Sequence, residues 1–260
     1  DEAMMRLAEI LDQNPLPEPA KPEEPLSSEV TFDHVTFRYP GMEHPALDDV
    51  SFTVKPGTIV GLVGPSGGGK STAAAMIPRF WDVQSGSVKI GGVDVRQMDS
   101  RDLMSRVAFV FQDTKLFKTS ILENIRMARP KATIEEVKAA AKAARCDDIL
   151  EKLPRGLDTV VGTQGVYLSG GEAQRIALAR AILKDAPIIV LDEASAFADP
   201  ENEALIQKAF EELTKDKTVL MIAHRLSTIR NANDILVMEK GKLAEWGSHE
   251  ELLAKGGLYA

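Results

Sequence analysis

Residues 64–71, with the sequence GPSGGGKS, have the types and spacing of a loop that binds the phosphates of a nucleotide. Glycines let successive backbone N–H groups turn toward phosphate oxygens, and a helix that begins at the loop adds the positive end of its dipole. A glycine-rich turn with an incidental lysine is the alternative; the strand-like run before the loop and the helix-like run after it argue against that. Lys70 is predicted to contact the β- and γ-phosphates, and Ser71 to offer its hydroxyl to Mg²⁺. The residues predicted to contact the nucleotide here are Gly64, Pro65, Ser66, Gly67, Gly68, Gly69, Lys70, Ser71 and Thr72.

Two adjacent carboxylates, Asp192 and Glu193, follow the apolar run PIIVL at 187–191. A buried strand of this kind delivers the residues at its carboxyl end to the crevice where ligands bind in a parallel sheet. Asp192 is predicted to hold the Mg²⁺ shell, and Glu193 to accept a hydrogen bond from the attacking water and act as general base. Alone, such a pair is more typical of a solvated helix start. The interpretation of Asp192 and Glu193 as site residues therefore depends on the phosphate loop in the same chain.

The sequence LSGGE at 168–172, followed by AQRIALARAIL, resembles the signature motif of ATP-binding cassette (ABC) proteins, and the resemblance extends over residues 29–260. It implies that Tyr39 stacks on adenine, that Gln112 bridges Mg²⁺ and the attacking water, and that His224 reaches the γ-phosphate. An aromatic face, a strand-end amide and a strand-end imidazole suit these roles, although each residue alone would more often be structural. Asp199 is also implied as a nucleotide-site residue, at the end of the loop SAFAD.

The signature motif further implies how two copies cooperate. In the family this loop completes the γ-phosphate site of a second nucleotide-binding domain, because its N–H groups lie at the start of a helix. ATP then holds the two domains head to tail, and hydrolysis lets them open. The isolated chain is expected to bind ATP as a monomer and to hydrolyse it in a transient dimer. The residues that the resemblance implies at the second copy's site are Ser169, Gly170, Gly171 and Glu172.

The elements that must position these residues follow from hydrophobic periodicity. Residues 30–37 and 50–54 alternate as strands of a small β unit, and 85–95 reads as a hairpin. The continuous apolar runs at 58–63, 107–112, 187–194 and 218–224 predict buried parallel strands. Residues 119–184 have helical periodicity, with a capping box at Thr133 and Glu136. The predicted fold is α/β: a P-loop NTPase (RecA-like) core with a parallel sheet, an N-terminal antiparallel β subdomain, and an inserted α-helical subdomain at about 115–183 that carries the signature motif.

Residues 1–28 are interpreted as the end of a transmembrane helix and a Pro-rich linker, and residues 29–260 as the ABC nucleotide-binding domain. Met4, Leu7, Ala8 and Leu11 have helical spacing, and five prolines between positions 15 and 25 favour an extended spacer. A disordered tail is the alternative for 14–28. The segments 160–172 and 223–253 resemble exporter-type half-transporters, whose transmembrane domain precedes the nucleotide-binding domain in the same chain. The resemblance therefore implies a second nucleotide-binding domain and this transmembrane domain as partners.

Composition excludes several classes. Among 260 residues, 31 are basic and 39 acidic, and a net charge of −8 argues against nucleic acid as a partner. The longest apolar runs fall short of the roughly 18 residues that cross a bilayer. The single cysteine, Cys146, is expected to be a buried thiol.

We expect a soluble fragment of a membrane protein at the cytoplasmic face of the inner membrane. The alternatives are a soluble ABC ATPase acting on ribosomes or nucleic acid, and an ATP-binding domain that is idle or has one impaired site in a heterodimeric transporter.

Three positions depart from the family pattern: Glu172 stands where Gln is usual, Thr163 where an acid is usual, and Ala196 where Ser is usual. Glu172 adds a negative charge near the shared phosphates, which repels them unless it is screened or turned outward. Hydrolysis is still expected, because the residues of the chemical step are intact. The variant SAFADPENE resembles half-transporters that handle iron–siderophore complexes.

Overall fold

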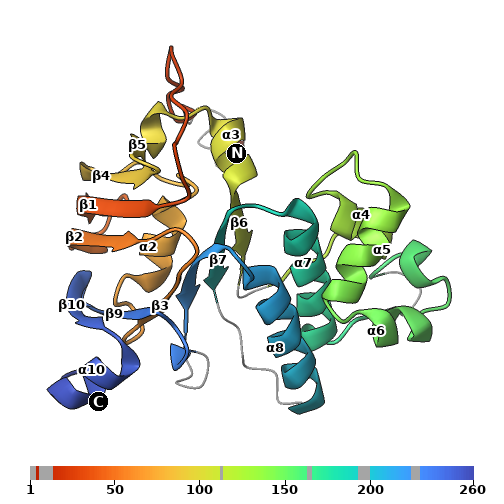
Figure 1. The fold of residues 1–260 in the computed structure, drawn as a ribbon. Helices are drawn as coiled ribbons and strands as arrows, with labels where there is room; N and C mark the ends of the chain where they lie inside the picture. The colour runs from red at the N-terminus through yellow and green to blue at the C-terminus, as the bar shows by residue number, and fades with distance from the viewer. Residues whose placement is uncertain (1–3, 6–13, 112–113, 163–165, 193–199, 224–228) are drawn as a thin grey trace.

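The computed structural model describes residues 4–5, 14–111, 114–162, 166–192, 200–223 and 229–260. Their strands form a four-stranded and a six-stranded sheet, and most of the helices lie together on one side of the molecule (Figure 1). The predicted α/β fold with a parallel sheet is confirmed. None of the described helices is both long enough and apolar enough to cross a bilayer.

The four-stranded sheet is antiparallel, in the order β2-β1-β4-β5. Val30, Phe32, Val35 and Phe37 of β1 are buried as the alternation predicts, and the pairing of β1 with β2 shifts between Phe32 and Val35. His34 has a left-handed φ of 51° at this shift, so the bulge returns Val35 to the core face. The strands are β1 (Val30–Phe37), β2 (Leu47–Val54), β4 (Ser85–Ile90) and β5 (Val93–Asp94).

The six-stranded sheet has the order β10-β9-β3-β8-β7-β6, and all neighbours are parallel except β10, which pairs antiparallel with β9. Alternate residues of β7 enter different cores: Ile188 and Val190 face one, Ile189 and Leu191 the other. Burial on both faces explains the continuous apolar runs. The strands are β3 (Ile59–Val63), β6 (Val107–Val110), β7 (Ile188–Asp192), β8 (Thr218–Ile222), β9 (Asp234–Glu239) and β10 (Lys242–Gly247).

Helices cover both faces of this sheet. The first core contains α2 and the antiparallel sheet, and the second contains α4 to α8, which stand together at the β6 end (Figure 1). The predicted capping box at Thr133 and Glu136 is confirmed. The helices are α2 (Lys70–Met76), α3 (Ser100–Arg106), α4 (Ile121–Arg126), α5 (Ile134–Ala143), α6 (Asp147–Lys152), α7 (Gly170–Lys184), α8 (Pro200–Thr214) and α10 (His249–Lys255), with short 3₁₀ turns at Val95–Gln97 and Gly156–Asp158.

Cys146 lies buried between α5 and α6, as predicted. Burial raises the pKa of its thiol to about 12. Because the thiolate is the reactive form, this cysteine is a packing residue and not a nucleophile.

The parallel strands end at a common edge. Leu62 of β3 and Asp192 of β7 both pair with Ile222 of β8, and Val110 of β6 pairs with Leu191. The residues that follow these strands therefore leave the sheet along one line, which is where an open α/β sheet binds its ligand.

Candidate nucleotide-binding site

The loop 64–69 is built against two other parts of the chain, which explains its glycines. A Cβ on Gly64 would lie 2.0 Å from the Met238 carbonyl oxygen, and a Cβ on Gly69 would lie 2.6 Å from that of Ala46. Both residues have positive φ, 131° and 101°. Gly241 completes the brace by donating its N–H to the Gly68 carbonyl at 3.1 Å. No other residue fits at Gly64 or Gly69 without moving the backbone.

The β9–β10 turn that braces the loop was not predicted from the sequence, and no strands were predicted over 234–247. The apolar run ILVM at 235–238 followed by the turn residues Lys240 and Gly241 is a hairpin signal that predicts them.

Lys70 begins helix α2 and is only 5% exposed. Its Nζ donates to the carbonyl oxygens of Gly64 and Pro65, each at 2.9 Å. Burial lowers the pKa of Lys70, and the negative charge of Asp192 partly opposes this. The ammonium therefore lies across the loop, in the electrostatic field of the acid at the end of β7.

Tyr39 forms the other wall of the site. Its ring meets Phe37 edge to face at 4.8 Å and Trp81 at 5.5 Å, and its hydroxyl lies 3.3 Å from Thr72 Oγ1. A cavity of about 720 Å³ joins this ring to the loop, and its lining includes Tyr39 and residues 67–72. This volume is in the range of small-molecule sites.

Asp192 is the last residue of β7, half-buried at the edge where the strands end. Its neighbour Glu193 and the predicted residues Gln112, Asp199 and His224 lie outside the described residues, as do the departures Thr163 and Ala196. The structure thus brings Tyr39 and the loop together on one cavity, and it places Asp192 near enough to Lys70 for their charges to interact, although Asp192 does not line that cavity.

The signature residues lie away from this cavity, since none of Ser169–Glu172 is among the described residues that line it. Helix α7 begins beside the start of α8, since a Cβ on Gly171 would lie 3.2 Å from Asn202 Cβ. Ser169 caps it: Ser169 Oγ accepts the Glu172 N–H at 3.2 Å, and Glu172 Oε2 accepts the Ser169 N–H at 2.8 Å. The Glu172 carboxylate is therefore held by the helix start, where the helix dipole stabilises a negative charge.

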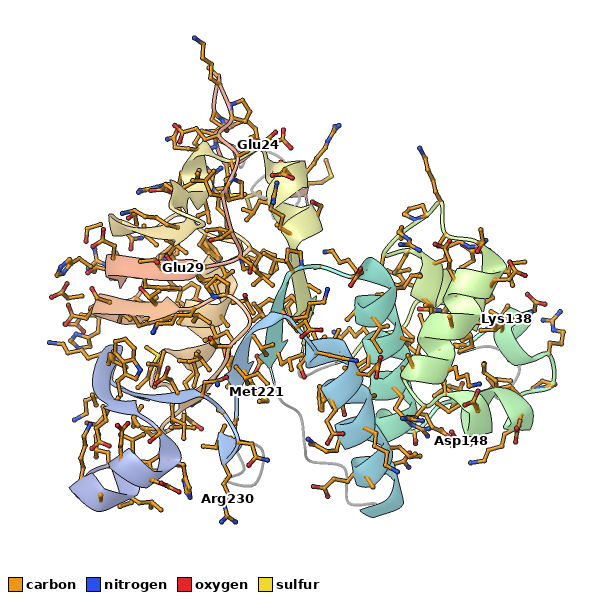
Figure 2. The ribbon with its side chains drawn as sticks, in the orientation of Figure 1. Glu24, Glu29, Lys138, Asp148, Met221 and Arg230 are labelled. Carbon is orange, nitrogen blue, oxygen red and sulfur yellow. The ribbon has the colours of Figure 1, made fainter. Side chains whose placement is uncertain are left out.

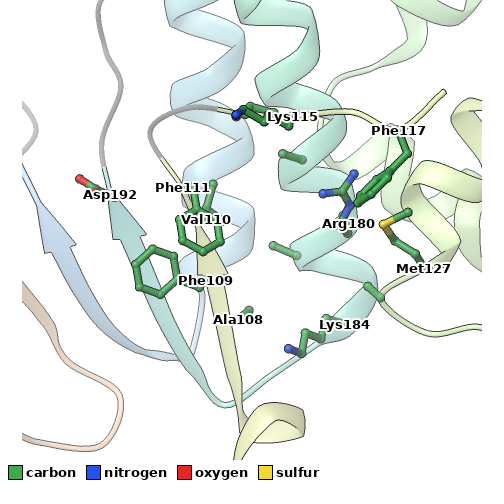
Figure 3. A pocket seen from close by; sticks show the side chains of 14 residues that line it. Ala108, Phe109, Val110, Phe111, Lys115, Phe117, Met127, Arg180, Lys184 and Asp192 are labelled. Carbon is green, nitrogen blue, oxygen red and sulfur yellow. The ribbon is translucent and has the colours of Figure 1, made fainter. Parts of the chain in front are cut away.

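A second cavity, of about 730 Å³, lies between β6 and α7, with Asp192 at one end of its lining (Figure 3). We call it the β6–α7 groove. Phe111 and Phe117 border it and are 52% and 59% exposed. Arg180 donates to the Asn124 carbonyl at 2.8 Å, and Lys184 to that of Val107 at 2.7 Å. The groove thus combines an aromatic wall with cations.

Comparisons with known proteins agree on one family. The family model described as "ABC transporter" matches residues 47–196. The mycobactin import ATP-binding/permease protein IrtA of Mycobacterium tuberculosis is 50% identical over 262 residues, which are 99% of this chain and 30% of that protein. The ATP-dependent lipid A-core flippase of Methylobacillus flagellatus is 51% identical over 232 residues, 89% of this chain and 40% of that protein.

A solved structure titled as a bacterial Atm1-family ABC exporter with ATP bound has a TM-score of 0.89 and 40% identity. The match covers 98% of this chain and 45% of that one. The chain therefore spans less than half the length of these relatives.

Proposed function

The chain belongs to the ABC transporter family, as an ATPase domain of the exporter type, and we propose that it is the motor through which ATP drives a longer transporter. The observation that carries the proposal is the cavity that joins the Tyr39 ring to the loop of Lys70, with Asp192 close enough to act on the Lys70 charge. This arrangement suits a nucleotide, which needs a stacking surface at one end and a cation with N–H groups at the other.

The residues present also fit Mg²⁺. The Ser71 hydroxyl lies at the start of α2, and the Asp192 carboxylate ends β7. Mg²⁺ in nucleotide sites takes one or two such oxygens and completes its shell with phosphates and water. Accordingly, a cluster of three or more metal-binding side chains is not needed, and none occurs among the described residues. We propose Ser71, Asp192 and Gln112 as its protein ligands; the ion would neutralise charge on the phosphates.

The proposed catalytic residues follow three neighbouring strands. Glu193 comes directly after β7, His224 comes two residues after β8, and Gln112 two residues after β6. In our proposal Glu193 accepts the proton of the attacking water, His224 donates to the γ-phosphate, and Gln112 orients the water. Lys70 leaves its loop carbonyls for the phosphates. The parallel register of the described strand ends supports this grouping.

We also propose that each site is completed by a second copy of the nucleotide-binding domain. Ser169, Gly170, Gly171 and Glu172 lie at the start of the 15-residue helix α7, away from the cavity of their own chain. In a head-to-tail pair they would meet the γ-phosphate of the partner, with Asp199 beside it. The capping box keeps the Glu172 carboxylate turned to its own helix, so its charge need not repel the phosphates.

Mixing two inactive variants tests this arrangement. Lys70→Ala removes the loop cation and Gly170→Asp blocks the signature loop, so each variant alone is expected to lose hydrolysis. In a mixed pair, one site combines both intact halves. Half of the pairs are mixed and each has one working site, so about a quarter of the native rate should return.

Phosphate release by the mixture is the measurement, and circular dichroism of each variant controls for folding. If the mixture stays as inactive as its components, the head-to-tail arrangement is wrong.

The β6–α7 groove is the surface we propose for the transmembrane domain. It is open, its wall carries two exposed phenylalanines, and it ends at Asp192, so an occupant would sit close to the nucleotide site. Lys115, Arg180 and Lys184 add positive charge. An apolar segment with an acidic residue would complement this lining.

In the full-length transporter, Phe117→Asp is expected to abolish the stimulation of ATP hydrolysis by cargo, while the isolated domain keeps its basal rate. Leu258→Asp is the matched control, because Leu258 is equally exposed, at 59%, and lies outside the groove. Equal loss of stimulation in both variants would rule the groove out as the docking site.

Relatives with different named cargos, mycobactin and lipid A-core, are about equally similar to this chain. That is expected of a motor whose residues do not touch the cargo. Because these relatives are membrane transporters, we place the chain at the cytoplasmic face of a membrane as part of such a protein, and the ribosomal or nucleic-acid alternative loses its support.

A further inference from the structure

The Pro-rich segment (residues 14–28) has neither helix nor strand, as its prolines predict, yet it is fastened to the domain. Glu23 N–H donates to the Gln97 carbonyl at 2.8 Å, and Leu26 N–H to that of Gly91 at 3.3 Å. Ser28 Oγ lies 2.8 Å from Thr218 Oγ1. In Figure 1 the red trace of this segment rises from β1 beside β5 and α3, and Figure 2 shows Glu24 in the same place.

Arg79 connects this segment to the phosphate loop. It follows the last turn of α2, and its N–H donates to the Met76 carbonyl at 3.1 Å. The Arg79 side chain is buried, 4% exposed, and its Nη2 donates to the Pro17 carbonyl at 2.9 Å. Two further bonds, at 2.7 and 3.0 Å, hold the guanidinium on the Asp82 carboxylate.

The backbone at Arg79 has a left-handed φ of 56°, which residues with a side chain rarely adopt. Such a conformation persists only where the surroundings hold it. Here the end of α2 does so: Arg79 N–H donates to the Met76 carbonyl and Phe80 N–H to the Ala75 carbonyl, each at 3.1 Å, so Arg79 is the left-handed residue that closes the helix.

The same short stretch touches both walls of the nucleotide site. Helix α2 carries Lys70 at its first residue and ends just before Arg79; its seven residues span about 10 Å. Trp81, two residues after Arg79, packs edge to face on Tyr39. A displacement of the stretch 79–82 would therefore move the loop helix and the Tyr39 ring together.

We propose that the Pro-rich segment is a seated regulatory strap: its contact with Arg79 and occupancy of the nucleotide site stabilise each other. This rests on the proposed function, since it assumes that a nucleotide binds between Tyr39 and Lys70. Coupling of this kind is reciprocal. Bound nucleotide strengthens the contact between the Pro-rich segment and Arg79 by the same factor by which that contact raises the affinity for nucleotide. Where the transmembrane domain pulls on the segment, it would change ATP affinity through this contact.

Hydrogen exchange on the 260-residue chain tests the coupling, with MgADP as the probe because it fills the loop without requiring a second copy. Exchange at the amides of Glu23 and Leu26 should slow by at least about fivefold when MgADP binds. In Arg79→Gln that slowing should vanish, and the MgADP dissociation constant should rise by a similar factor.

Arg96→Gln is the matched control. Arg96 also holds a nearby carboxylate, Asp94, and one carbonyl, Gly86 at 3.0 Å, but it bonds neither the strap nor α2. Arg96→Gln should keep the full slowing of exchange at Glu23 and Leu26 when MgADP binds.

Glu18→Gln provides a variant that cannot unfold the domain: Glu18 is exposed on the strap and its Oε2 accepts the Ser100 N–H at 3.3 Å. It should weaken the slowing in part.

The amides of residues 64–72 report binding itself. If MgADP protects them and the exchange of Glu23 and Leu26 does not change, or if Arg79→Gln keeps the slowing, the strap proposal is wrong and the nucleotide site stands. If residues 64–72 are not protected at all, the proposed function fails, and the strap proposal fails with it.

Discussion

Replacing Glu193 with Gln is expected to stop ATP hydrolysis while leaving ATP binding intact. Glutamine keeps the size of the side chain but cannot accept the proton of the attacking water, and loss of a general base costs at least about 100-fold in rate. The proposed contacts of the nucleotide, at Tyr39 and at the loop of Lys70, are untouched. Because ATP then persists at the shared sites, the head-to-tail pair should accumulate.

The measurements are phosphate release, the dissociation constant for MgATP, and elution from a sizing column with and without MgATP. Glu211→Gln is the control, because this substitution makes the same chemical change at an exposed position of α8. If the Glu193 variant kept turnover within a few-fold of the native chain, Glu193 would not be the base. Loss of MgATP binding would instead assign it to the binding of nucleotide.

Local patterns in the sequence predicted the phosphate loop and the strands other than β9 and β10, because their causes are local. The alternation of Val30, Phe32, Val35 and Phe37 follows from one buried face of a strand. From the sequence, the glycines of the loop are explained by the backbone N–H groups that must turn toward phosphate oxygens. The structure adds that Gly64 and Gly69 are also required by the carbonyls of Met238 and Ala46, which lie far from them in the sequence.

The roles that the sequence did not reveal depend on contacts between distant segments. The β6–α7 groove combines residues from β6, the segment after it, the two residues that follow α4, α7 and the end of β7, and no pattern in one segment predicts it. The anchoring of the Pro-rich segment uses mostly backbone N–H and carbonyl groups, which give no signal in the sequence; among the described residues of the segment, only Glu18 and Ser28 contribute side chains to it. The capping box of Ser169 and Glu172 was not predicted, although its S-x-x-E sequence before a helix is the kind of pattern that did predict the box at Thr133 and Glu136.

Arg175 holds in place helix α7, which we call the signature helix because it begins at residues 169–172. It projects from α7, is 1% exposed, and binds both Asp148 carboxylate oxygens, at 2.5 and 3.0 Å, at the start of α6. The same guanidinium donates to the Arg145 carbonyl and to Asn202 Oδ1 of α8 at 2.9 Å. Helix α8 begins directly after the segment 193–199, so Arg175 ties the signature helix both to its neighbouring helices and to the chain that follows Glu193.

Arg175→Ala is therefore expected to lower the free energy of unfolding by about 3 kcal/mol and to prevent the ATP-dependent pair from forming. Removing one partner of a buried ion pair costs about 3–5 kcal/mol, and the lower end applies because Asp148 is 41% exposed. Urea unfolding measures the loss. Arg126→Ala is the control: its pair with Glu123 is more exposed, and its loss should cost at most about 1 kcal/mol.

The effect of pH separates the ion pair from simple packing. The hydrogen bond from Arg175 lowers the pKa of Asp148 below its ordinary 3.8 in the folded chain. The pair therefore adds its full stability above that ordinary value and loses it as pH falls through the lowered pKa. The difference in stability between the native chain and Arg175→Ala should shrink at pH values below about 3.8. If the stability difference between the two chains stays constant down to acid unfolding, Arg175 acts through packing and through its hydrogen bonds to two uncharged acceptors, the Arg145 carbonyl and Asn202 Oδ1. Asp148 would then have no part in holding the signature helix.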